Sequence, residues 1–104
     1  MIFQHTWHQV LWGYKTRTTR VGLKRVPSVG QTIAVQPGRG KKAVCRVRVV
    51  LVEYVAHARD SLVDRRFEEG FASADVAVET WRAMHGDYNG PGLVIWFTFC
   101  RRME

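Results

Sequence analysis

Residues 43–55 form the longest stretch of the chain that is typical of a β-strand. Apolar residues occupy every second position from Ala43 to Leu51, while the alternate positions include Arg46 and Arg48 before they too become apolar. A second strand is expected at 32–36, and six residues separate it from the first, which is too few for the crossover that parallel strands need. The two segments therefore predict an antiparallel hairpin and argue against a doubly wound parallel sheet.

The remaining expected elements are two helices, a loop and one strand. The pattern predicts one helix at 6–13 and a second at 73–86. Between them, residues 57–69 are expected to form a loop with a helical turn, and residues 93–100 a closing strand. Ser73 is placed to cap the second helix, and Gly86 to end it. We therefore expect a single α+β domain spanning residues 1–104, in which a small curved sheet or barrel is covered by two helices.

The chain carries a large excess of positive charge. Sixteen Lys and Arg against nine Asp and Glu give a formal net charge of +7 and an isoelectric point of about 10.1. Such a charge favours encounters with anions, including nucleic acid. No segment approaches the ~18 apolar residues of a membrane span, and the first residues lack the pattern of a signal peptide. We expect a cytoplasmic protein with no membrane partner.

Two patterns that would bind a cofactor are incomplete. His5 and His8 lie three residues apart, but no third ligand stands at a convincing spacing. The glycine-rich segment 38–42 lacks the spacing of a phosphate-binding loop and joins two strands instead of a strand and a helix. We therefore expect no metal, no nucleotide triphosphate and no cofactor.

Residues 13–20, with the sequence Gly-Tyr-Lys-Thr-Arg-Thr-Thr-Arg, hold the strongest candidates for chemistry. A free lysine has a pKa near 10.4, and burial or neighbouring cations lower that value. A neutral Lys15 can accept the proton of Thr18 or attack a carbonyl itself. Residues three apart point to opposite faces of a regular strand, so this pairing requires an irregular backbone, which Gly13 is placed to begin. The alternative is a solvated basic turn without chemistry.

Two further features lie near predicted boundaries. Glu68 and Glu69 form an acidic pair just ahead of the Ser73 cap, where either carboxylate can orient a lysine or act as a general acid. The alternative for this pair is a solvated turn. Trp12 directly precedes Gly13 and is a candidate for stacking on a base.

The motifs follow one another in a characteristic order: Phe3-Gln4, Val10-Leu11, residues 13–20, Pro37-Gly38, Glu69-Gly70-Phe71, Trp81 and residues 94–99. This order resembles the ASCH family of the PUA-like superfamily over nearly the whole chain. The pattern Gly-x-Lys-Thr-x-Thr-x-Arg is its most specific part. The resemblance implies a PUA-like fold, and in length and spacing the chain is most similar to small bacterial amidohydrolases that remove the acyl group of N4-acetylcytidine.

The resemblance also implies a site. Those enzymes are described with a catalytic Lys, Thr and Glu, which match Lys15, Thr18 and Glu69. The resemblance implies that the exocyclic amide of an N4-acylcytidine is hydrolysed, without a metal ion, to cytidine and a carboxylic acid. Thr18 would attack after Lys15 accepts its proton, or Lys15 or Glu69 would activate water directly. The oxyanion would be stabilised by backbone amides near Gly13 or by Arg20, with Arg20 as the first candidate.

Two rival functions remain open, because the ASCH family also includes proposed ribonucleases and RNA-binding modules. Polar residues stand at 17 and 19, where the bacterial enzymes commonly have apolar ones, and the charge is higher. A metal-independent ribonuclease would use Lys15 and Glu69 on a 2′-hydroxyl and the phosphate. A non-catalytic RNA-binding module would hold phosphates with the cations of the hairpin and its loop, namely Arg39, Lys41, Lys42, Arg46 and Arg48.

Overall fold

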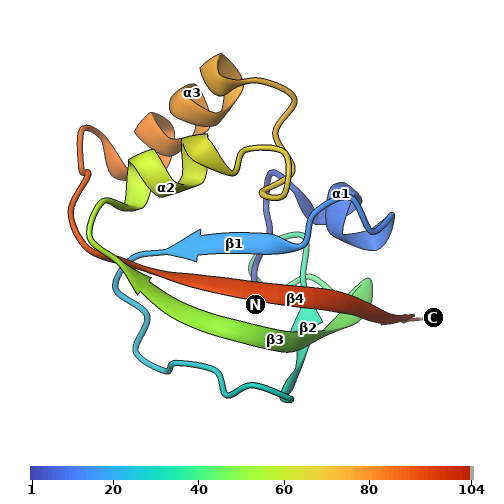
Figure 1. The fold of residues 1–104 in the computed structure, drawn as a ribbon. Helices are drawn as coiled ribbons and strands as arrows, with labels where there is room; N and C mark the ends of the chain where they lie inside the picture. The colour runs from blue at the N-terminus through green and yellow to red at the C-terminus, as the bar shows by residue number, and fades with distance from the viewer. Residues whose placement is uncertain (104) are drawn as a thin grey trace.

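A four-stranded antiparallel sheet forms the centre of the computed structural model, which describes residues 1–103 (Figure 1). Its strands are, in chain order, β1 (Arg17–Arg20), β2 (Thr32–Val35), β3 (Cys45–Val55) and β4 (Gly92–Arg102). They stand in the order β1-β4-β3-β2, so the last strand lies between the first and the third. The expected hairpin is the antiparallel β2–β3 pair, and the α+β class is confirmed.

The long β3–β4 pair is irregular at two points. Its register shifts between Arg46 and Val47 and again between Val49 and Leu51. Such bulges increase the local twist and curve a sheet. Beyond β2, Ile2 forms a parallel bridge with Gln36, so the N-terminal residues continue the sheet. The sheet is therefore curved, with β1 left at one edge.

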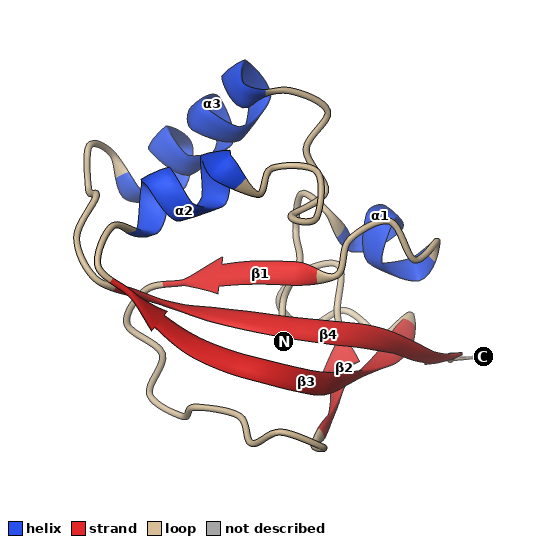
Figure 2. Ribbon diagram, in the orientation of Figure 1, coloured by secondary structure: helices blue, strands red, loops and turns tan. Residues whose placement is uncertain are grey.

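Figure 2 shows three helices beside the sheet: α1 (Trp7–Leu11), α2 (Ala58–Asp64) and α3 (Ala74–His85). The α3 helix begins as predicted, because Ser73 Oγ accepts a hydrogen bond of 3.3 Å from the Val76 amide. The expectation of two helices was wrong in number. The α2 helix lies in the segment expected to be a loop with a helical turn. Since Ala58 and Leu62 are its only buried residues, this helix depends on packing against α3. No helix within residues 1–103 is long and apolar enough to span a membrane.

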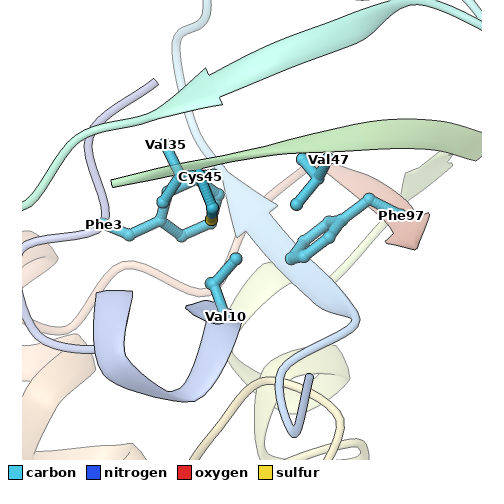
Figure 3. Close-up of a cluster of buried hydrophobic side chains, with 6 residues drawn as sticks. All are labelled: Phe3, Val10, Val35, Cys45, Val47 and Phe97. Atoms are coloured by element: carbon cyan, nitrogen blue, oxygen red, sulfur yellow. The ribbon is translucent and has the colours of Figure 1, made fainter. Parts of the chain in front are cut away.

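The buried interior of residues 1–103 contains three apolar clusters, of which the smallest consists of Val49, Leu93 and Ile95 in β3 and β4. The two larger clusters are separated by polar side chains. Figure 3 shows the first cluster, in which the N-terminal segment and α1 pack on the sheet through Phe3, Val10, Val35, Cys45, Val47 and Phe97. The second joins α2, α3 and the segment between them through Ala58, Leu62, Phe71, Ala77 and Trp81. The Nζ of Lys15 lies 5.8 Å from the Phe3 ring centre and 5.7 Å from that of Phe71. The buried lysine is thus held between an aromatic ring of each of these two larger clusters.

Gly92, the first residue of β4, is packed closely against α2. A Cβ at this position would lie 2.7 Å from the Cβ of Ala58 and 3.3 Å from the carbonyl oxygen of Arg20. We expect Gly92→Ala to lower the free energy of unfolding by about 1–3 kcal/mol, because the backbone must shift to make room. Urea denaturation measures the effect. In an Ala58→Gly background the same substitution should cost clearly less, and an equal cost in both backgrounds would contradict this account.

Candidate active site

The segment before α3 covers the free edge of β1. The carbonyl oxygen of Glu68 accepts hydrogen bonds from the amides of Thr16, at 2.8 Å, and Arg17, at 3.1 Å. The next residue, Glu69, therefore directs its carboxylate at the strand. Gly70 follows with a φ of 93° and lies against the Lys15 side chain, where a Cβ would come within 3.4 Å of it. A residue without a side chain allows both the turn and the close approach.

The Glu69 carboxylate is almost completely buried, at 1% exposure, and both of its oxygens accept hydrogen bonds. Thr19 donates twice, from its amide to Oε1 at 3.1 Å and from Oγ1 to Oε2 at 2.7 Å. Arg17 Nη1 donates to Oε2 at 3.0 Å, and Lys15 Nζ forms an ion pair with Oε1 at 3.6 Å. These partners fix the carboxylate in one position.

Arg17 has further contacts that hold it in place. Its guanidinium donates to Ser61 Oγ, at 2.6 Å, and to the Ser61 carbonyl oxygen, at 3.0 Å. It also lies 5.1 Å from the ring centre of Trp96, whose indole Nε1 donates to Glu53 at 2.9 Å. Arg17 therefore connects the Glu69 carboxylate to α2 and to the centre of the sheet.

Lys15 is buried, at 4% exposure, and its Nζ donates to the Glu69 carbonyl oxygen at 2.5 Å. Burial lowers its pKa, the attraction of Glu69 opposes this shift, and the nearby cations Arg20 and Arg17 add to it, so that the pKa falls to about 8. At pH 7 about a tenth of the molecules then carry a neutral amine, compared with well under a thousandth for a free lysine. Lys15 can therefore act as a base near neutral pH.

The backbone before β1 is irregular, as the pairing of Lys15 with Thr18 required. Gly13 has a φ of 79°, and the carbonyl oxygen of Gln9 accepts hydrogen bonds from the amides of both Tyr14 and Lys15. The strand begins only at residue 17. Lys15 is therefore free of the strand geometry that would point it away from Thr18.

Thr18 and Arg20 form the next part of the site. Arg20 Nε donates to Thr18 Oγ1 at 3.1 Å, and Arg20 Nη2 donates to the carbonyl oxygen of Ile2 at 2.8 Å. The guanidinium lies 4.8 Å from the ring centre of Phe3. Burial lowers the pKa of Arg20, although its ordinary value is high enough that the side chain remains a cation. No carboxylate within residues 1–103 forms an ion pair with it.

A cavity of 270 Å³ brings these residues together. Its polar wall comes from β1 and the segments before β1 and α3, and includes Lys15, Thr18, Thr19, Arg20 and Glu69. Its other walls include apolar side chains and the C-terminal half of α3, namely Leu23, Leu62, Phe71, Thr80, Met84 and His85. The rim near the N-terminus is formed by Gln4, His5 and Thr6. The cavity is thus a partly open pocket with a base, a hydroxyl and a cation on one side.

Two of the substrate-binding candidates do not line this cavity. Trp12 is 65% exposed, and Arg102 lies over its ring at 5.4 Å from the ring centre. Gly13 is also outside the lining, and its amide donates to the Val10 carbonyl oxygen. The cations proposed for the RNA-binding alternative, Arg39, Lys41, Lys42, Arg46 and Arg48, do not line it either.

Sequence reasoning missed Thr19 and Ser61 as parts of the site and treated Arg17 only as a nearby cation. A signal for Thr19 was present, because residues 15, 17 and 19 are spaced two apart and all three contact Glu69. No comparable signal existed for Ser61. Within residues 1–103 no group of three or more His, Cys, Asp or Glu side chains could hold a metal ion.

The fold was compared with known proteins. No family model matches the chain, and no curated protein matches it in sequence. Solved structures do match. The ASCH protein of Zymomonas mobilis has a TM-score of 0.70 at 14% identity, over 100% of this chain and 71% of its own. A protein of Enterococcus faecalis V583 from the DUF984 family has a TM-score of 0.75 at 14% identity, over 97% of this chain and 76% of its own.

An ASCH domain from Lactobacillus crispatus JV V101 gives a TM-score of 0.64 at 14% identity, over 91% of this chain and 70% of its own. The chain therefore has the fold of ASCH domain proteins. The fold that the sequence motifs implied is confirmed by these structures, whereas the reaction is a separate question.

The lowered pKa of Lys15 has a consequence for stability. Between pH 8 and 10.5 the unfolded chain binds more protons at this lysine than the folded protein does, so this group makes folding more favourable as the pH rises. Relative to Lys15→Met, the free energy of unfolding of the wild type should rise by up to about 3 kcal/mol over this range. Urea denaturation at several pH values measures it. Lys24→Met, at an exposed lysine, should show no such change, and a constant difference between Lys15→Met and wild type would refute the lowered pKa.

Proposed function

We propose that this protein is an amidohydrolase that cleaves the exocyclic amide of N4-acylcytidines to cytidine and a carboxylic acid. The observation that carries the proposal is the buried Lys15, whose pKa is near 8, in a cavity also lined by Thr18 and Arg20. The class of substrate comes from the resemblance of residues 13–20 and 69–71 to the bacterial amidohydrolases. The shared ASCH fold is compatible with this reaction and with others.

Glu69 acts in this proposal as a positioning group. Both of its oxygens already accept hydrogen bonds from Arg17 and Thr19, so it is poorly placed to deliver a proton to the leaving group. Its carbonyl oxygen and its carboxylate instead hold the Lys15 amine. With its N–H bonds directed at Glu69, neutral Lys15 has a lone pair available for a proton from the cavity.

Arg20 stabilises the oxyanion. The alternative donors near Gly13 are already used, because the amides of residues 13, 14 and 15 donate to carbonyl oxygens of α1. Arg20 Nε and Nη2 already donate hydrogen bonds to Thr18 and Ile2. Its third nitrogen, Nη1, has no hydrogen-bond acceptor among the described residues and is accessible to solvent. Arg20 is also joined to Thr18 Oγ1, so a charge that develops beside Thr18 lies next to a fixed cation.

The reaction then proceeds in two halves. Thr18 Oγ attacks the acyl carbon while its proton passes to Lys15, and the tetrahedral oxyanion forms beside Arg20. Collapse breaks the bond between the acyl carbon and N4, and Lys15 returns the proton to N4 so that cytidine leaves. Lys15 next deprotonates a water molecule that attacks the acyl carbon of the Thr18 ester. Collapse of this second intermediate breaks the bond between the acyl carbon and Thr18 Oγ, Lys15 returns the proton to Oγ, and the carboxylic acid is released. A single-step variant, in which Lys15 activates water directly, uses the same groups without the ester.

The purified protein should convert N4-acetylcytidine to cytidine, as measured by chromatography. Lys15→Ala and Glu69→Gln should each lower kcat/KM by at least about 100-fold, because the general base is lost or released. Thr18→Val should do the same if the ester forms, and mass spectrometry of rapidly quenched wild type should then detect an acylated Thr18. Lys24→Ala removes an exposed lysine as a control. Wild-type turnover by a folded Lys15→Ala variant would exclude the proposal.

The pH dependence of kcat/KM provides an independent check. Because the neutral form of Lys15 is the active one, kcat/KM should rise with pH through a single ionisation near pH 8 and level off above it. Arg20 stays charged throughout this pH range and therefore adds no second ionisation to the pH profile. A rate that falls as the pH rises through 8 would show that the protonated lysine is required, which contradicts its role as a base.

A further inference from the structure

Positive and negative charges are segregated along the chain. Residues 1–52 contain ten Lys and Arg and no Asp or Glu, and residues 88–103 contain two Arg and again no acid. Eight of the nine acidic residues fall between 53 and 87, the stretch that forms the end of β3 and both α2 and α3. The helical layer of α2 and α3 is therefore acidic, and the rest of the described protein is basic.

The cations concentrate where β3 begins and β4 ends. Cys45 pairs with Arg102 and Arg46 with Arg101, so both C-terminal arginines lie beside the start of β3. The exposed loop before β3 adds two lysines next to them. We call this group of five cations, Lys41, Lys42, Arg46, Arg101 and Arg102, the basic end.

The basic end holds like charges against each other. Arg46 and Arg101 are direct cross-strand partners, and like charges in such a pair are destabilising. Each carboxylate that forms an ion pair within residues 1–103 does so with Lys15, Arg17, Arg59 or Arg65, so no described carboxylate is paired with a cation of the basic end. A polyanion bound at this surface would relieve the repulsion.

An aromatic platform lies next to the basic end. Trp12 is 65% exposed, and the Arg102 guanidinium lies over its ring, at 5.4 Å from the ring centre. Cations alternating with an exposed aromatic ring are the combination that binds single strands, because the cations hold phosphates and the ring stacks on a base. The platform distinguishes this surface from one that is merely basic.

The basic end is connected to the cavity through α1. Gln4, His5 and Thr6 form part of the cavity rim and immediately precede α1, and Trp12 immediately follows it. Figure 1 shows α1 beside the C-terminal end of β4, in agreement with the contact between Arg102 and Trp12. The five residues of α1 span about 8 Å, which a short run of nucleotides can cross.

We propose that the substrate is an acylated cytidine within single-stranded RNA, whose modified base enters the cavity while its backbone crosses α1 to the basic end. This inference rests on the proposed amidohydrolase function and adds the polymer to it. The cavity requires a base that is free of a duplex stack, which favours a single strand. The proposed function acts on a cytidine, whose sugar is ribose, and RNA is the polymer that contains this nucleoside.

Binding is tested first, without any reaction. Fluorescence anisotropy with a labelled 12-nucleotide oligouridylate should give a log–log salt slope of about −3, as expected for four or five phosphate contacts on a single strand. Arg101→Gln/Arg102→Gln should weaken binding about tenfold or more and reduce the slope by about 1.4. Lys41→Gln/Lys42→Gln, which changes only exposed loop residues, should act in the same direction even if the arginine variant folds poorly.

Matched controls separate the basic end from overall charge. Arg65→Gln/Arg82→Gln removes two exposed cations from the acidic layer and should leave RNA binding within about twofold of wild type. RNA should also quench tryptophan fluorescence through the exposed Trp12, and Trp12→Phe should lose that quenching. Equal losses in the basic-end and control variants would overturn the proposal, as would equal or tighter binding of DNA, duplex RNA or vesicles of anionic lipid.

Kinetics then connect the surface to the cavity. With one N4-acetylcytidine in the middle of the 12-mer, kcat/KM should exceed that for free N4-acetylcytidine by at least about tenfold at low salt, and only the oligonucleotide reaction should depend on salt. The two basic-end variants should lose this advantage and retain wild-type activity on the nucleoside. Equal kcat/KM on both substrates would overturn the proposal about RNA and leave the amidohydrolase intact. No activity on either would instead remove the proposed function.

Discussion

The structure around the cavity depends on the burial of one carboxylate, that of Glu69. A buried carboxylate is costly unless each of its oxygens is hydrogen-bonded, and here Thr19, Arg17 and Lys15 supply those partners. The donors come from β1 and the residues just before it, and the acceptor comes from the segment before α3. Since Arg17 also bonds to Ser61, the same anion fixes where α2 lies.

The buried charges do not balance, and this imbalance determines which group can move a proton. Three cations, Lys15, Arg17 and Arg20, lie near the single carboxylate Glu69. The group best able to lose a proton is the lysine, because burial and the neighbouring cations lower its pKa to about 8. A second carboxylate in place of Arg20 would reverse this effect and hold Lys15 charged.

Much of the fold was predictable because it depends on short-range signals. The short expected connection, residues 37–42, predicted the β2–β3 hairpin, and Ser73 marked the start of α3. The α2 helix was missed because only Ala58 and Leu62 are buried in it, and two positions do not define a helical stripe.

The composition of the cavity was predictable only in part. Lys15, Thr18, Arg20 and Glu69 share one cavity, as the motif order implied, although their roles stay predictions. Trp12 was chosen because it adjoins residues 13–20 in sequence, but its ring lies under Arg102 instead. The wall contributed by α3 depends on how that helix docks, and no local pattern in the sequence reports such a contact.

The covering of the edge strand β1 also affects how prone the protein is to aggregate in solution. An uncovered edge strand offers unpaired backbone groups on which another chain can assemble, and here the carbonyl oxygen of Glu68 and the side chain of Glu69 occupy those groups. Local opening of residues 65–70 would therefore disassemble the cavity and expose a template for aggregation in the same event. For this protein, inactivation and self-association would share a single origin.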